Sequence, residues 1–105
     1  MAKKAFVVGV DGDATRAERD AFTQYLQSER PGLGLWHHVS HVWLILDPNG
    51  HLNPTLLRDK LVQLMPKRHT IVLQISPETF AAYSPTSGHK WLQDYMFSDS
   101  DWWLD

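Results

Sequence analysis

Histidines gather in one short stretch, GLWHHVSHVWLILD, which spans residues 34–47. Imidazole nitrogens are common metal ligands, so His37, His38 and His41 raise the question of a metal site. Neighbouring side chains on a strand point to opposite faces, so His37 and His38 cannot share one ion. His38 and His41 could meet across a tight hairpin, but the spacing places no carboxylate or third ligand beside them. We therefore predict no metal site and expect these histidines at a sheet edge or a dimer interface.

A basic run, Lys67-Arg68-His69, is the second group that could do chemistry. If the first strand lies beside the fourth, Lys3 and Lys4 could join this run in a phosphate-binding patch. The alternative is that these are solvated charges beside a helix end, which suits the net charge of −2. Lys67 and Arg68 are thus candidate phosphate-binding residues, although the overall charge does not favour RNA as a partner.

Composition limits the other kinds of chemistry. The chain of 105 residues has the size of one domain and contains no cysteine, which excludes disulfides, thiolate zinc sites and cysteine nucleophiles. It has no G-x-S-x-G motif and no glycine-rich phosphate loop. The short apolar run near the N-terminus breaks at Asp11, too early for a signal peptide, and no segment is long enough to span a membrane. We expect a cytoplasmic protein that does not enter the membrane.

The hydrophobic pattern places these residues on alternating strands and helices. The apolar run 4–10 predicts an interior strand, and Thr15 with Glu18 has the spacing of a capping box that begins a helix. Residues 35–38 and 41–46 predict a hairpin, and Asn53-Pro54 predicts the start of a second helix that ends at Pro66. A fourth strand is expected over 70–75, followed by short helices near 77–83 and around Trp91.

This order predicts an α+β ferredoxin-like sandwich with a βαββαβ core. We expect an antiparallel four-stranded sheet in the order 4-1-3-2, with two helices on one face. The whole chain, 1–105, is predicted to be one domain with a core over 4–76 and a C-terminal helical extension over 77–105. The central strands are apolar on both faces, so either the extension or a second copy of the chain should cover the face without helices.

The hairpin also carries a family resemblance. Trp36-His37, then Trp43 after a short polar turn, then Leu44-Ile45, resembles the small CRISPR-associated endoribonuclease-like proteins and their antitoxin-like relatives. The resemblance covers about residues 4–76. It implies a homodimer and, in the nuclease branch, a divalent metal held by aspartates at the end of the first strand, where Asp11 matches.

Asp11 and Asp13 consequently have two interpretations. As catalytic residues they would hold the metal that activates water for phosphodiester attack. As turn residues they would bond local backbone groups between the strand and the helix, which is the more frequent role of such residues. The sequence leaves both open.

Aromatic residues suggest contact with another protein. Trp102 and Trp103 stand among acidic residues at the C-terminus and would either pack on the uncovered sheet face or dock a partner. Trp36 and His38 lie on the expected edge strand. We predict a small prokaryotic interaction or regulatory protein of defence or toxin–antitoxin type, with no cofactor. The alternative is a metal-dependent endoribonuclease, and only this alternative needs a divalent ion.

Overall fold

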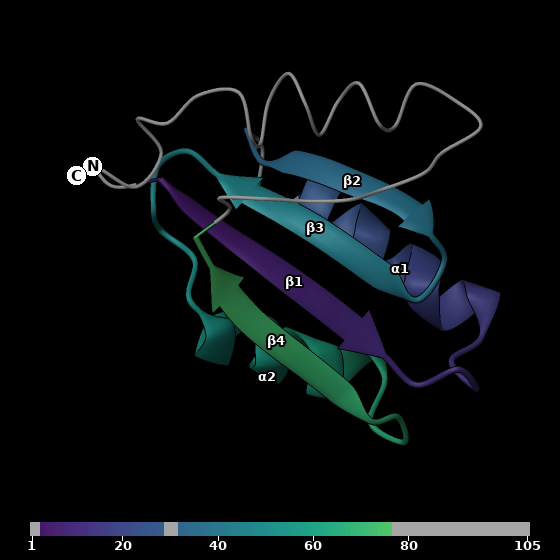
Figure 1. The fold of residues 1–105 in the computed structure, drawn as a ribbon. Coiled ribbons are helices and arrows are strands. Elements are labelled where there is room, and N and C mark those ends of the chain that lie inside the picture. The colour runs from purple at the N-terminus through teal and green to yellow at the C-terminus, as the bar shows by residue number, and fades with distance from the viewer. Residues whose placement is uncertain (1–2, 29–31, 77–105) are drawn as a thin grey trace.

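A computed structural model describes residues 3–28 and 32–76, which form one four-stranded sheet and two helices (Figure 1). The predicted helices beyond residue 76 and the C-terminal extension lie outside the described residues. No helix in the described part of the chain is long and apolar enough to cross a membrane. In chain order the elements are β1 (Lys4–Val10), α1 (Arg16–Ser28), β2 (Gly34–Val39), β3 (Val42–Asp47), α2 (Pro54–Leu64) and β4 (Thr70–Ile75).

The sheet has the order β2-β3-β1-β4, and every neighbouring pair is antiparallel. This is the predicted ferredoxin-like topology with the apolar strands β1 and β3 in the centre, so the predicted fold class is confirmed. Both helices lie behind the sheet in the view of Figure 1 and cover a single face. The opposite face carries no helix from the described residues.

Local signals in the sequence determine where both helices begin. In the capping box of α1, the Thr15 N–H donates to Glu18 Oε1 at 2.9 Å and the Glu18 N–H donates to Thr15 Oγ1 at 3.2 Å. At α2, Asn53 Oδ1 accepts from the Leu56 N–H at 2.9 Å, and Pro54 occupies the first turn. Both predicted helix starts are confirmed.

The main core lies between the helices and the sheet. Trp43 is fully buried at its centre, with an edge-to-face contact to Phe22 at 5.1 Å between ring centroids. Its indole N–H donates to Thr23 Oγ1 at 3.0 Å, so the one polar atom of the ring is satisfied. The other buried members of this core are Phe6, Val8, Ala14, Leu26, Ile45, Leu52, Leu57, Leu61 and Met65.

Asp47 ends β3 and is 2% exposed, which is unusual for a carboxylate. Its Oδ2 accepts from the Leu52 N–H at 2.7 Å and its Oδ1 from the Asn49 N–H at 3.1 Å. The chain turns at residues 47–50, where the Gly50 N–H donates to the Asp47 carbonyl at 3.4 Å and Gly50 has φ 67°. The Asp47 carboxylate thus accepts two backbone N–H groups of the loop between β3 and α2, and these bonds stabilise the conformation of that loop.

Candidate functional site

A groove of about 340 Å³ opens where β1 ends, and it collects side chains from three strands. The backbone brings them together, because the Val10 N–H donates to the His41 carbonyl at 3.0 Å and the Asp11 N–H donates to the His69 carbonyl at 2.8 Å. Gly9 leaves the groove open, since a Cβ there would lie 3.3 Å from Ile71 Cγ2. The lining residues are Gly9, Val10, Asp11, His41, Val42, His69, Thr70 and Ile71.

Asp11 organises the turn that leaves β1. Its Oδ1 accepts the Asp13 N–H at 2.8 Å, and its carbonyl accepts the Ala14 N–H at 3.0 Å. The hydrogen bond from Asp13 is the main cause that lowers the pKa of Asp11. The backbone of His69 and the positive charges of His69 and Arg68 lower this pKa further, while partial desolvation opposes them. Asp11 thus has the geometry of a turn residue and also lines the groove, whereas Asp13 is exposed.

The two candidate phosphate-binding residues lie near this end of the sheet but differ in environment. Lys67 is exposed, whereas the Arg68 Nε donates to Glu18 Oε1 at 3.0 Å in a partly buried ion pair. The pKa of Glu18 is lowered, first by the Thr15 N–H and then by Arg68. Arg68 therefore joins the start of α1 to the start of β4, and its Nε is occupied by a carboxylate.

Lys3 and Lys4 do not join this basic run. β1 does lie beside β4, but the two strands are antiparallel, with Ala5 opposite Ile75 and Val10 opposite Thr70. Lys4 is consequently at the far end of the sheet, where its Nζ donates to the Leu52 carbonyl at 3.1 Å. The expectation that Lys3 and Lys4 join the basic run in one phosphate-binding patch is therefore wrong.

The two adjacent histidines of the hairpin contact different tryptophans. His37 stacks on Trp43 with ring centroids 4.4 Å apart, and its Nε2 is 2.8 Å from the Ser40 carbonyl. His38 packs against Trp36 at 5.2 Å, and Trp43 and Trp36 lie on opposite faces of the sheet. The two adjacent histidines therefore point to opposite faces, as expected.

His41 belongs to the groove. Its Nδ1 is 3.0 Å from Ser40 Oγ, while its Nε2 is buried and has no hydrogen-bond partner in the described part of the chain. Within residues 3–28 and 32–76, no three histidine or acidic side chains come close enough to hold a metal ion. Asp11 Oδ1 accepts the Asp13 N–H, so a divalent ion of the kind that the nuclease resemblance implies would use the other carboxylate oxygen and would need further oxygen ligands from outside this cluster.

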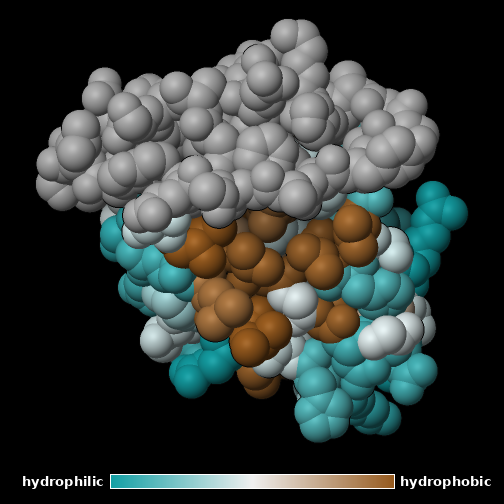
Figure 2. Space-filling model, viewed as in Figure 1, coloured by the Kyte–Doolittle hydropathy of each residue, from teal (hydrophilic) through white to brown (hydrophobic). Residues whose placement is uncertain are grey.

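The helix-free face of the sheet is the second candidate region, and we call it the free face. Strand alternation and pairing place apolar side chains there from the three strands β1, β3 and β4. Ile71 and Leu73 are 57% and 51% exposed, and Figure 2 shows the resulting hydrophobic area on this side of the molecule. Its aliphatic members are Ala5, Val7, Val42, Leu44, Leu46, Ile71, Leu73 and Ile75.

The predicted interaction residues are unequally placed with respect to this face. Trp36 pairs with Leu44 and thus belongs to the free face, but it is 6% exposed. His38 is on the same side of β2 and is exposed. Trp102 and Trp103 lie outside the described residues.

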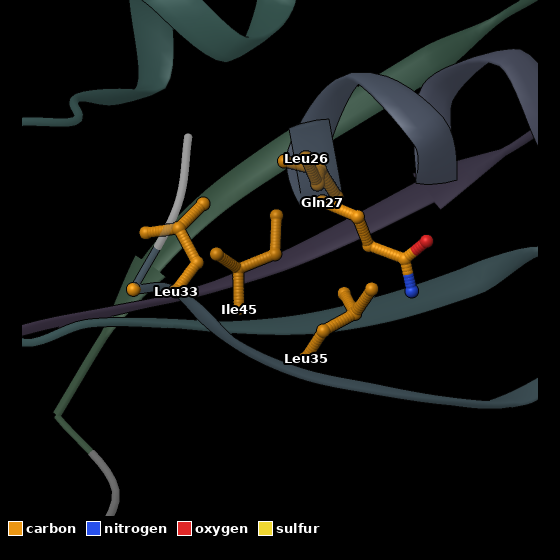
Figure 3. A pocket seen from close by; sticks show the side chains of 6 residues that line it. Leu26, Gln27, Leu33, Leu35 and Ile45 are labelled. Atoms are coloured by element: carbon orange, nitrogen blue, oxygen red, sulfur yellow. The ribbon is translucent and has the colours of Figure 1, made fainter. Parts of the chain in front are cut away.

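A smaller cleft of about 160 Å³ lies between the end of α1 and the hairpin strands (Figure 3). Leu26, Leu33, Leu35 and Ile45 line it with apolar atoms, and Gln27 supplies an amide. Among the described lining residues no side chain titrates, so they supply none of the groups that acid–base or metal chemistry requires.

His41 and His69 are the groove residues that the sequence analysis did not connect with Asp11. Their proximity comes from strand register, and the only local signal is that His41 begins one predicted strand and His69 directly precedes another. In comparisons with protein families, curated proteins and solved structures, nothing matches this chain.

Proposed function

We propose that this protein is a small, non-catalytic interaction or regulatory protein of a prokaryotic defence or toxin–antitoxin system. In this proposal it acts in the cytoplasm, as a homodimer, through contact with another protein. The observation that carries the proposal is the free face, on which Ile71 and Leu73 are more than half exposed beside a sheet centre that is apolar on both sides. Exposed apolar patches of this kind mark protein contact sites.

The charge and the aromatic residues support the same function. A net charge of −2 does not favour a phosphate-binding surface, whereas an aromatic and aliphatic face suits a protein partner. His38 stands at the edge of this face, next to Trp36. Trp102 and Trp103 are the proposed aromatic anchors for a partner that docks at the C-terminus.

The products of adjoining genes are the partners to test first, by co-expression and capture on the tagged full-length chain. Ile71→Asp puts a charge on the free face and should reduce capture at least tenfold. Val62→Asp is the matched control, because Val62 is 54% exposed on α2 and should leave capture unchanged. A partner that binds both variants equally well would contradict a role for the free face.

A metal-dependent endoribonuclease is the second candidate, and the groove beside Asp11 is the observation that favours it. Asp11 and Asp13 would be its catalytic residues, and Lys67 and Arg68 would hold phosphate. RNA cleavage should then require magnesium or manganese and fall sharply in Asp11→Ala. Amide NMR shifts around residues 10–14 on titration with either ion provide a second readout. Undiminished cleavage by Asp11→Ala would exclude this candidate.

A further inference from the structure

The two edges of the sheet differ in how well they resist pairing with another strand. β2 has a register irregularity between Trp36 and Val39, and bulges of this kind protect an edge. β4, with the sequence TIVLQI, has no charge and no proline, and its register with β1 is regular over its whole length. A regular apolar edge without such protection is a template for another strand.

We propose that β4 pairs with β4 of a second copy of this chain, antiparallel, about a two-fold axis at Val72. This joins two four-stranded sheets into one continuous sheet. The inference rests on the homodimer proposed above and identifies the element and the register that form it.

The hydrogen bond from Asp11 to the His69 carbonyl determines which backbone groups of β4 are free. In an antiparallel ladder, hydrogen-bonded and non-hydrogen-bonded pairs alternate. Residues 71, 73 and 75 therefore exchange bonds with β1, and the N–H and C=O groups of Thr70, Val72 and Gln74 point away from it. The Val10 bond to His41 agrees, because it assigns the even residues of β1 to β3. Among the described strands, β1 is the only neighbour of β4.

A second copy satisfies these groups in a single register. With Val72 opposite Val72 of the second copy, Thr70 stands opposite Gln74, and each of these pairs exchanges two hydrogen bonds. Ile71 then lies opposite Leu73 of the second copy, on the free face, where both side chains lose solvent exposure. No like charges meet, because the strand carries none. The same chain is thus complementary to itself in backbone bonding, apolar contact and charge.

This arrangement separates the two copies of Asp11. Asp11 is aligned with His69, three residues from the axis, so the two carboxylates lie on opposite sides of Val72. At about 3.4 Å per residue they are roughly 20 Å apart along the strand direction alone. The proposed dimer therefore does not bring two Asp11 side chains to one metal ion.

The first test measures association of the full-length chain by sedimentation over about 1 µM to 1 mM. The wild-type chain of 12.1 kDa should form a dimer. Leu73→Lys should weaken the dimer at least tenfold, because it places a charge against Ile71 of the second copy. Val62→Lys makes a similar change at a residue of similar exposure on α2 and should not alter association. A wild-type monomer at every concentration, or a dimer that Leu73→Lys does not weaken, would overturn the proposal.

The second test reports the register. Because the chain has no cysteine, Thr70→Cys with Gln74→Cys introduces the only thiols, and mild oxidation should give a covalent dimer. Thr70→Cys alone is the control and should cross-link far less. In the dimer, the Val72 and Gln74 amides should also exchange slowly with solvent. Slow exchange of these amides in a monomer would assign the edge to another segment of the same chain and overturn the proposal.

Partner capture is scored separately from association. A dimer that captures no partner would count against the proposed function and leave the β4 contact standing. A monomer that captures a partner through the free face would contradict the β4 contact and support the proposed function.

Discussion

Both faces of the sheet are rich in apolar residues, but the exposure of these residues differs sharply between the centre of the helix face and β4 on the free face. On the helix face, Trp43 and Phe6 are fully buried under α1 and α2. On the free face, Leu73 and Ile71 are about half exposed on β4. The same strands supply both sets, so hydrophobicity alone does not decide which residues form the core. Helices α1 and α2 bury the first set. On the free face Trp36 and Ala5 are buried as well, so the exposed apolar residues lie on β4, and these are the ones that we propose for association.

Truncation of Trp43 should have the largest effect on stability. Trp43→Ala removes a fully buried ring, its contact with Phe22 and its hydrogen bond to Thr23, and should lower the free energy of unfolding by about 3–5 kcal/mol. Urea denaturation measures this directly. If the variant does not fold, Ile45→Val tests the same core with an expected loss of about 0.5–1.5 kcal/mol. If these core variants lose no more free energy of unfolding than variants of free-face residues, the helix face is not the main source of stability.

Asp47 should come next, because it stabilises the end of the helix face through polar contacts. Asp47→Ala leaves the Leu52 N–H buried without its acceptor and should cost about 2–3 kcal/mol in urea denaturation. Asp47→Asn keeps one acceptor oxygen and should cost clearly less. Equal losses in the two variants would show that the carboxylate acts through its charge and not through these two bonds.

Much of the fold follows from short signals in the sequence. Thr15 with Glu18 and Asn53 with Pro54 each bond to backbone within four residues, so their sequence spacing is enough to predict the helix starts. The order of strands follows from the apolar content of residues 4–10 and 42–47. Topology is therefore largely a local and compositional property here.

The groove could not be predicted in the same way, because it depends on register. Asp11 meets His69 only because Val10 pairs with Thr70, sixty residues later in the chain, and the sequence of each strand alone would allow several alignments. The same register moves Lys4 to the far end of the sheet. The residues Asp47-Pro48-Asn49-Gly50 have the composition of a turn, but the bond that the Asp47 carboxylate accepts from the Leu52 N–H depends on the path of the whole loop.

Truncation on the free face should cost less than truncation in the core. Leu73→Ala should lower the stability of the monomer by about 1 kcal/mol, since the side chain is 51% exposed. At protein concentrations where β4 pairs, the loss should grow, because association adds to the stability of the wild-type chain. Denaturation at two concentrations separates these terms. If the loss of stability in Leu73→Ala is the same at both protein concentrations, Leu73 is not part of the dimer contact. Ile45→Val is the control, because its loss of stability should not depend on protein concentration.

The smallest change should come from the carboxylates at the groove end of the sheet. The pKa values of Asp11 and Glu18 are lowered from 3.8 and 4.5, chiefly by the Asp13 and Thr15 N–H groups, respectively. A lowered pKa means that the folded state favours the charged form. The resulting stability is complete above the ordinary pKa values and is lost as the pH falls below about 4.5 and then below 3.8 towards the folded pKa values.

Urea midpoints measured from pH 7 down to about pH 3 test this sign. Asp11→Asn combined with Glu18→Gln should make the acid decline shallower than in the wild-type chain. Arg68→Gln should have a weaker effect of the same kind, because Arg68 lowers both pKa values but is the main cause of neither. If the double variant declined as steeply as the wild type, other groups would have to account for the acid sensitivity. The hydrogen bonds that Asp11 and Glu18 accept would then stabilise this end of the sheet without depending on the charge of the two side chains.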